Sequence, residues 1–170
     1  MAWSSAHNPV GARFAMNSRR ICRESALQAL YLCDAVGDFS SQTALIFAEH
    51  FLEAGLREDG EPRLPQAVDS FYNQLLDGVL TNLETIDTEI SLASTNWSVA
   101  RMAPVERNIL RVAVYELLYR SDIPSKVSVN EAIEIAKEFA SPDGPTFVNG
   151  VLNKVVQRVG LKGGSGLRLE

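Results

Sequence analysis

The sequence has too few cysteines and histidines for most metal and redox chemistry. Its 170 residues include two cysteines and two histidines. If one helix contains Cys22 and Cys33, about three turns and roughly 16 Å of rise separate them. A disulfide requires Cα atoms within about 7 Å of each other, and two cysteines alone do not make a zinc site. We therefore expect both to be buried, reduced side chains of a cytoplasmic protein.

Other absences restrict the function further. No run of about 18 apolar residues is present, so the sequence predicts no transmembrane helix. His7 and His50 stand in no catalytic motif, and there is no phosphate-binding glycine loop and no Gly-x-Ser-x-Gly. Glu131, Glu134 and Glu138 have helical spacing but no histidine beside them, which favours a solvated face over a metal site. We predict a protein that is not an enzyme and has no cofactor, no metal and no catalytic residue.

Charge is distributed unevenly along the chain. The net charge of −5 at pH 7 argues against a uniformly basic nucleic-acid binder. Residues 1–23, however, contain Arg13, Arg19, Arg20 and Arg23 and no acidic residue. The other 12 of the 16 basic residues stand with all 21 acidic residues in the rest of the chain. Such asymmetry indicates either a local anion-binding site or merely a solvated N-terminus.

Hydrophobic periodicity predicts helices throughout. Apolar residues recur at i, i+3, i+4 and i+7, and strand-like alternation persists nowhere. Glycines, prolines and capping residues divide the pattern into about seven helices, at about 18–36, 41–55, 66–80, 83–90, 104–120, 128–139 and 146–160. We therefore predict an all-α fold in three parts: a flexible extension over 1–17, a helical domain over 18–160 and a flexible tail over 161–170.

Particular residues mark the ends of these helices. Pro104 suits a first helical turn, where its missing N–H is harmless. The stretch from Ser128 to Glu131 matches a capping box and predicts that a helix starts at Ser128. Gly37 and Gly160 are typical of the residue after a helix. The break near Trp97 suggests two packed helical bundles, with this aromatic side chain between them.

The first predicted helix has one narrow polar face. At about 100° per residue, it groups Arg20, Arg23, Gln28 and Tyr31, while the apolar residues cover the opposite side. Arginine binds phosphates through a fork of donors, tyrosine stacks on bases and glutamine hydrogen-bonds to base edges. Arginines in the first turns also oppose the helix dipole unless an anion joins them. The face is therefore either a nucleic-acid site or a set of ion pairs with Glu24 or with acids elsewhere.

Three stretches of the sequence match one protein family. Residues 19–31 read RRICRESALQALY, residues 147–154 read FVNGVLNK, and a long central stretch covers 101–139. On these residues the chain resembles the NusB family over about residues 18–159. The resemblance implies two packed helical bundles. It also implies transcription antitermination: binding of boxA, a single-stranded RNA element of ribosomal RNA operon leaders, together with the small-subunit ribosomal protein NusE, to help RNA polymerase pass terminators.

The resemblance also assigns roles to residues. It implies RNA contacts at two places, the first helix and the turn before the last helix, on Arg19, Arg20, Arg23, Gln28, Tyr31, Phe139, Asp143, Phe147 and Asn149. It implies that Glu106 and Arg111 face the protein partner, although Arg111 can equally belong to a structural ion pair and Glu106 can be a first-turn acid. The basic run is interrupted by Ile21 and Cys22, so we expect fewer phosphate contacts than in the family's longer basic arms.

Two other functions stay open at this point. One is an RNA-targeting helical domain related to that of ribosomal RNA cytosine methyltransferases, although the chain has no methyl-donor glycine motif. The other is a helical adaptor that binds only protein. Salt-dependent RNA binding would distinguish the adaptor from an antitermination factor.

Overall fold

The protein is built from α-helices. The computed structural model describes residues 9–47, 66–95 and 97–164, and of residues 9–17, 47, 66–69 and 161–164 it describes the backbone alone. In these residues the chain forms no strand and seven α-helices, with one short 3-10 helix: α1 (Pro9–Val36), α2 (Ser41–Phe47), α3 (Gln66–Thr81), α4 (Leu83–Ala93), η3 (Val99–Arg101), α5 (Pro104–Tyr119), α6 (Ser125–Phe139) and α7 (Gly144–Gly164). The predicted all-α class is confirmed.

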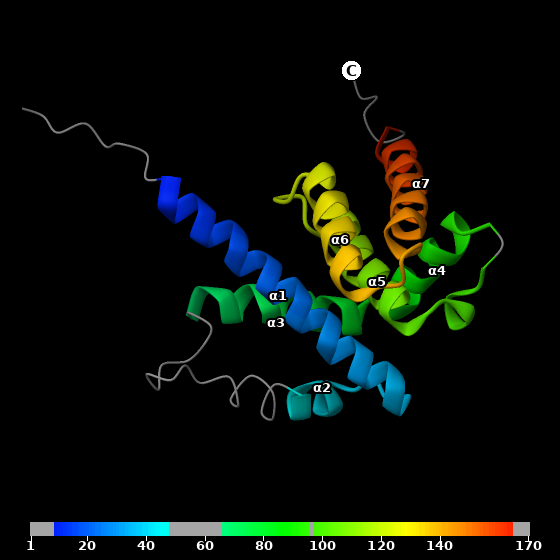
Figure 1. Cartoon of the computed structure of the whole chain (residues 1–170). Helices are drawn as coiled ribbons and strands as arrows, with labels where there is room; N and C mark the ends of the chain where they lie inside the picture. The colour runs from blue at the N-terminus through cyan, green and yellow to red at the C-terminus, as the bar shows by residue number, and fades with distance from the viewer. Residues whose placement is uncertain (1–8, 48–65, 96, 165–170) are drawn as a thin grey trace, which may run out of the picture.

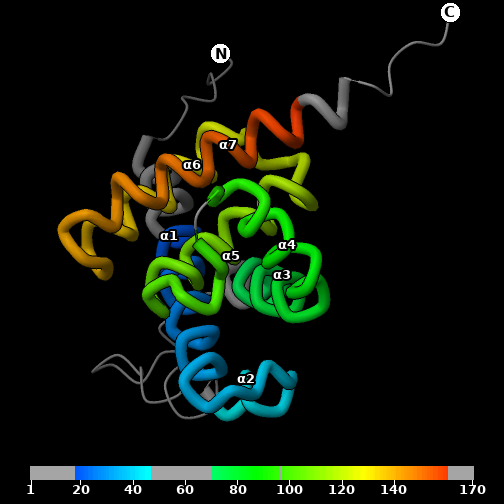
Figure 2. Tube along the Cα trace, turned by 90° about the vertical axis from the view of Figure 1, so that its right-hand side faces the viewer, coloured from blue at the N-terminus to red at the C-terminus, as the bar shows by residue number. Residues whose placement is uncertain are grey.

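Helix α5 lies at the centre of the molecule (Figure 1). Nine consecutive residues of α5, from Asn108 to Glu116, are buried. A helix buries its whole circumference only when other elements surround it, and α5 packs against α1 and α3 as well as α4, α6 and α7. Figure 2 shows α6 and α7 side by side above α5. The helices thus form two packed groups, as predicted, although their members are α1–α3 and α4–α7.

The two groups do not meet at Trp97. Helix α4 packs against α5 and α7, so the division between the groups falls before α4. Trp97 is 52% exposed, and its described neighbour is the guanidinium of Arg101, 5.7 Å from the ring centroid. The prediction that this ring packs between bundles is therefore wrong.

Three predicted helix ends are also wrong. Helix α1 begins at Pro9 rather than Ser18, and α7 continues past Gly160 to Gly164. Helix α6 begins at Ser125, because the carbonyl of Pro124 already accepts hydrogen bonds from the amides of Val127 and Ser128. Ser128 is thus inside the helix and caps nothing.

Other sequence features behave as predicted. Pro104 occupies the first turn of α5. Gly37 ends α1 with φ of +72°, a left-handed conformation that glycine adopts without strain. Cys22 and Cys33 are both fully buried, and neither forms a disulfide. In the described ranges, no helix has the length and apolarity needed to span a membrane.

Some predictions cannot be compared with the structure. His7, His50 and the predicted helical stretch 48–55 lie outside the described residues. The division of the chain into an extension, a domain and a tail stays a prediction, although residues 9–17 and 161–164 continue α1 and α7.

Candidate nucleic-acid interface

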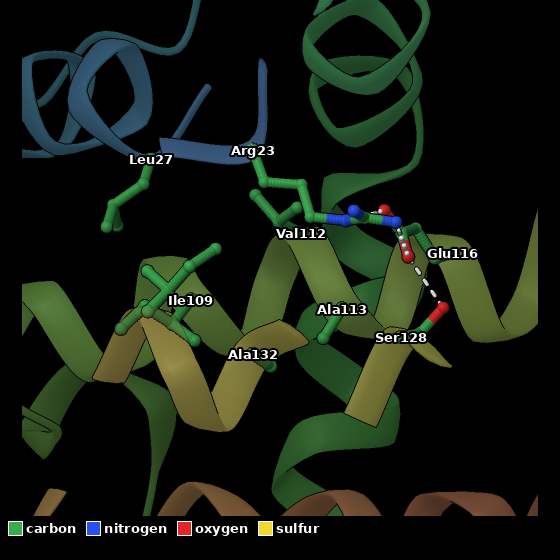
Figure 3. Close-up of a pocket in the computed structure, with 9 residues that line it drawn as sticks. Arg23, Leu27, Ile109, Val112, Ala113, Glu116, Ser128 and Ala132 are labelled. Carbon is green, nitrogen blue, oxygen red and sulfur yellow. Dashed lines mark hydrogen bonds and ion pairs between the residues drawn. The ribbon is translucent and has the colours of Figure 1, made fainter. Parts of the chain in front are cut away.

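Arg23 points into the protein rather than into solvent (Figure 3). It is 4% exposed, and its Nε and Nη2 donate to the Glu116 carboxylate at 2.7 and 3.2 Å. The Ser128 hydroxyl donates to the same carboxylate at 2.6 Å. A helical wheel cannot reveal that α5 supplies a buried acid on this side, so the prediction that Arg23 shares an exposed face is wrong. Arg23 instead anchors α1 to α5.

The space beside this ion pair is too small for a ligand. The cavity has a volume of about 10 Å³ and is lined mainly by apolar side chains, among them Leu27, Ile109 and Val112. A single water molecule needs about this much room. The buried pair is therefore a structural contact and not the floor of a binding pocket.

Arg20 forms a similar pair at the surface. Its Nε and Nη2 donate to the two carboxylate oxygens of Glu131 on α6, each at 2.8 Å. These bonds raise the pKa of Arg20 and lower the pKa of Glu131. The Arg20 side chain is nevertheless 37% exposed, and no described residue uses its Nη1, which leaves donors for an anion. The Glu131 side chain is only 13% exposed to solvent. The prediction that Glu131, Glu134 and Glu138 form one solvated face is therefore wrong for Glu131.

The remaining predicted residues of α1 are open to solvent. Arg19, Gln28 and Tyr31 are all exposed. The guanidinium of Arg19 lies 5.1 Å from the centre of the Phe71 ring of α3, and it forms no ion pair with any described residue. The structure therefore leaves two cations, an amide and an aromatic ring available along this side of α1.

The end of α6 lies close to α1. Burial, and next the charge of Glu138, raise the pKa of Glu24, so the last turn of α6 is near the α1 face. Phe139 is exposed at that turn. In the turn that follows and the start of α7, Asp143 is exposed while Phe147 and Asn149 are half-buried. The structure thus places Phe139 at an exposed position near the end of α6.

The two residues assigned to the protein partner differ in position. Arg111 is buried and donates to both carboxylate oxygens of Asp87 at 2.8 Å, and to the Asn108 side chain at 2.9 Å. It is therefore the structural ion-pair member that the sequence allowed as an alternative. Glu106 is half-buried at the start of α5 and accepts a hydrogen bond from the Ser141 hydroxyl at 2.8 Å. Only Glu106 lies where a partner can reach it.

A second ion-pair network fixes α1 against α5. Asp34 accepts hydrogen bonds from Arg107 and from the side chain of Asn108. Burial raises the pKa of Asp34, but these hydrogen bonds and the neighbouring guanidinium charges outweigh it and hold that pKa below its usual range. The sequence did not predict these acidic partners, although Glu116 is marked by its position inside an apolar stretch of α5.

Comparisons with known proteins identify the family. A family model described as "NusB family" matches residues 20–157, which is most of the chain. The chain belongs to the NusB family. The transcription antitermination protein NusB of Citrifermentans bemidjiense is 45% identical over 144 residues, covering 85% of this chain and 97% of the relative. The resemblance found in the sequence is thus confirmed.

Solved structures of NusB proteins share the fold. NusB from T. maritima has a TM-score of 0.69 and 32% identity, with 82% of this chain and 90% of that chain covered. A structure of the antitermination factors NusB and NusE in complex with dsRNA also has a TM-score of 0.69, covering 84% of this chain and 98% of that chain. At 24% identity, this second likeness concerns the fold alone.

Proposed function

We propose that this NusB-family chain is a transcription antitermination factor rather than an enzyme. It binds boxA-type single-stranded RNA of ribosomal RNA operon leaders together with the small-subunit ribosomal protein NusE. It acts in the cytoplasm as part of the RNA polymerase antitermination complex and promotes transcription of ribosomal RNA. Membership of a family whose relatives are named transcription antitermination proteins supports this proposal.

The observation that carries the RNA assignment is the solvent-open side of α1. Arg19 and Arg20 present guanidinium donors, which suit phosphate groups. Tyr31 presents a ring on which a base stacks, and Phe139 adds a second exposed ring at the end of α6. Gln28 offers an amide to a base edge. Cations beside aromatic rings are the combination that single-stranded nucleic acids require.

The other candidate residues have supporting roles in this proposal. Asp143, Phe147 and Asn149 extend the RNA contact past the end of α6. Glu106, next to the α6–α7 turn through its hydrogen bond with Ser141, faces NusE. Arg23, which the sequence placed among the RNA contacts, acts indirectly by holding α1 in position.

A salt titration of RNA binding tests the assignment. The affinity for a boxA-type RNA, with NusE present, is measured at several salt concentrations. Each phosphate contact on a single strand contributes about −0.7 to the slope of log affinity against log salt. Arg20→Ala should therefore flatten the slope by about 0.7, whereas Tyr31→Ala should weaken binding by about 1–3 kcal/mol with little change in slope.

Arg101→Ala is the matched control. Arg101 is an exposed arginine stacked on an aromatic ring, like Arg19, but it belongs to η3 rather than to α1. This variant should bind RNA as the wild type does. RNA binding that is insensitive to salt, to Arg20→Ala and to Tyr31→Ala would refute the assignment of the RNA site to α1. Absence of RNA binding would favour an adaptor that binds only protein.

A further inference from the structure

Three arginines surround one aromatic ring where α1, α3 and the α5–α6 connection meet. The guanidinium carbons of Arg19, Arg23 and Arg120 lie 5.1, 5.4 and 5.3 Å from the centre of the Phe71 ring. Arg23 is neutralised by Glu116, and Arg120 by Asp122, to which it donates two hydrogen bonds of 2.8 and 2.9 Å. In the described part of the chain, Arg19 has no carboxylate of its own. The cluster therefore presents one uncompensated positive charge.

A shallow, open groove begins beside this cluster. It runs along α3, with Tyr115 of α5 on its other side, and has a volume of about 730 Å³. Gln74 connects it to the arginines, because its side-chain oxygen accepts a hydrogen bond of 2.9 Å from Arg120. Asn73 lies beside Gln74 on the groove wall, is exposed, and its amide bonds to no described residue. The groove thus offers an unoccupied donor and acceptor next to a cation.

Tyr115 lines the groove from the α5 side, and Tyr119, which is not part of the lining, stacks on it near the end of α5. Tyr115 lies directly against Gly78 of α3, where a Cβ atom would come impossibly close to the ring, so a glycine is required there. Tyr119, one turn later, stacks on Tyr115 with ring centroids 5.5 Å apart and an interplanar angle of 27°. Tyr119 is 44% exposed, so it presents a ring face to solvent that the ring beneath it holds in place.

We propose that this groove binds a nucleotide of single-stranded RNA that flanks the boxA-type element held on α1. Arg19 binds the phosphate that connects the two sites, the base stacks on Tyr119, and the Asn73 amide hydrogen-bonds to its edge. An amide suits this role because it both donates and accepts. The proposal rests on the RNA function proposed above and extends the RNA path from α1 onto α3 and α5.

The charges in the groove determine which part of the nucleotide enters it. Asp77 lines the groove beyond Asn73, next to Gly78, and a carboxylate there repels phosphate. The sugar–phosphate backbone therefore stays at the arginine end, and the base enters the groove. The lining combines amide, hydroxyl and carboxyl groups with apolar surface. The positive charge of Arg19 at the arginine end, rather than the lining itself, favours RNA over a protein helix.

Two RNAs test the proposal. One is the boxA-type element alone, and the other carries a few additional nucleotides at the 5′ or the 3′ end. Dissociation constants are measured with NusE present. One extension should bind the wild-type protein about fivefold tighter or more than the element alone, the lower end of what one stacked base contributes. Tyr119→Ala and Asn73→Ala should remove this gain and leave the affinity for the element alone unchanged.

Two control variants sharpen the result. Tyr119→Phe keeps the ring and should keep the gain, whereas Trp97→Ala removes an exposed ring of the connection between α4 and α5 and should change nothing. If the wild-type protein does not bind the element alone, the proposed function fails and the groove assignment with it. If it binds the element but neither extension adds affinity, or if Tyr119→Ala weakens both RNAs equally, only the groove assignment is refuted. If Tyr119→Ala and Asn73→Ala weaken NusE binding but leave the gain in affinity for the extended RNA unchanged, the groove is a protein interface and the proposal is overturned.

Discussion

Replacing Arg23 with methionine removes one partner of a fully buried ion pair. The change deletes both guanidinium hydrogen bonds to Glu116 and the second, 3.8 Å approach to Glu131. Glu116, itself 1% exposed, would keep the Ser128 hydroxyl as its one described side-chain donor. Leaving a buried charge without its partner costs about 3–5 kcal/mol. We expect Arg23→Met to lower the free energy of unfolding by about that amount, a large share of the roughly 5–15 kcal/mol that holds a typical domain.

Urea unfolding followed by circular dichroism measures this loss. The matched variant is the double substitution Arg23→Met with Glu116→Gln, which removes the buried charge as well. Because replacing both partners is often nearly neutral, the double variant should regain much of the stability that the single variant loses. The two single variants and the double variant form a cycle that isolates the energy of the pair itself.

The same variants distinguish a structural role from an RNA contact. The double variant, once shown to be folded, should keep the wild-type salt slope for RNA, because Arg23 does not reach solvent. A stability loss below about 1 kcal/mol for Arg23→Met would mean that the buried pair is not formed. A flatter salt slope in the folded double variant would return Arg23 to the RNA-binding residues.

Two further substitutions follow from the ion-pair networks. Ser128→Ala should lower the free energy of urea unfolding by about 1.5–3 kcal/mol, since it removes a donor to the buried Glu116 carboxylate; an unchanged midpoint would refute that bond. Asp34→Asn tests the contact with Arg107: the folded-state pKa of Asp34 is below the unfolded value of about 3.9, so its stabilisation is present above that value and is lost as the pH falls through the folded-state pKa. The variant should be less stable than the wild type at neutral pH, and the difference should shrink below about pH 4 in unfolding measured across pH; a constant difference would contradict the pKa direction.

Several features of the protein were predictable because they depend on local sequence. Helices α3, α4 and α5 lie close to where periodicity placed them, since an amphipathic pattern specifies which side of a helix is buried. Gly37 and Pro104 act through their own backbone geometry, which needs no distant partner. The quoted motifs also predicted the family correctly.

The tertiary structure decided which charged residues meet. A wheel places Arg20 and Arg23 on one side of α1, but their partners, Glu131 and Glu116, are 111 and 93 residues away in the sequence. A hydrogen bond within a helix links residues four apart, so it can be inferred from neighbours; an ion pair between helices depends on how those helices pack. The apparent capping box also could not be judged from local sequence. Helix α6 begins after Pro124, so Ser128 lies inside the helix and its hydroxyl donates to Glu116 of α5. Local sequence thus determined the helices, and only their packing decided which arginines stay available for RNA.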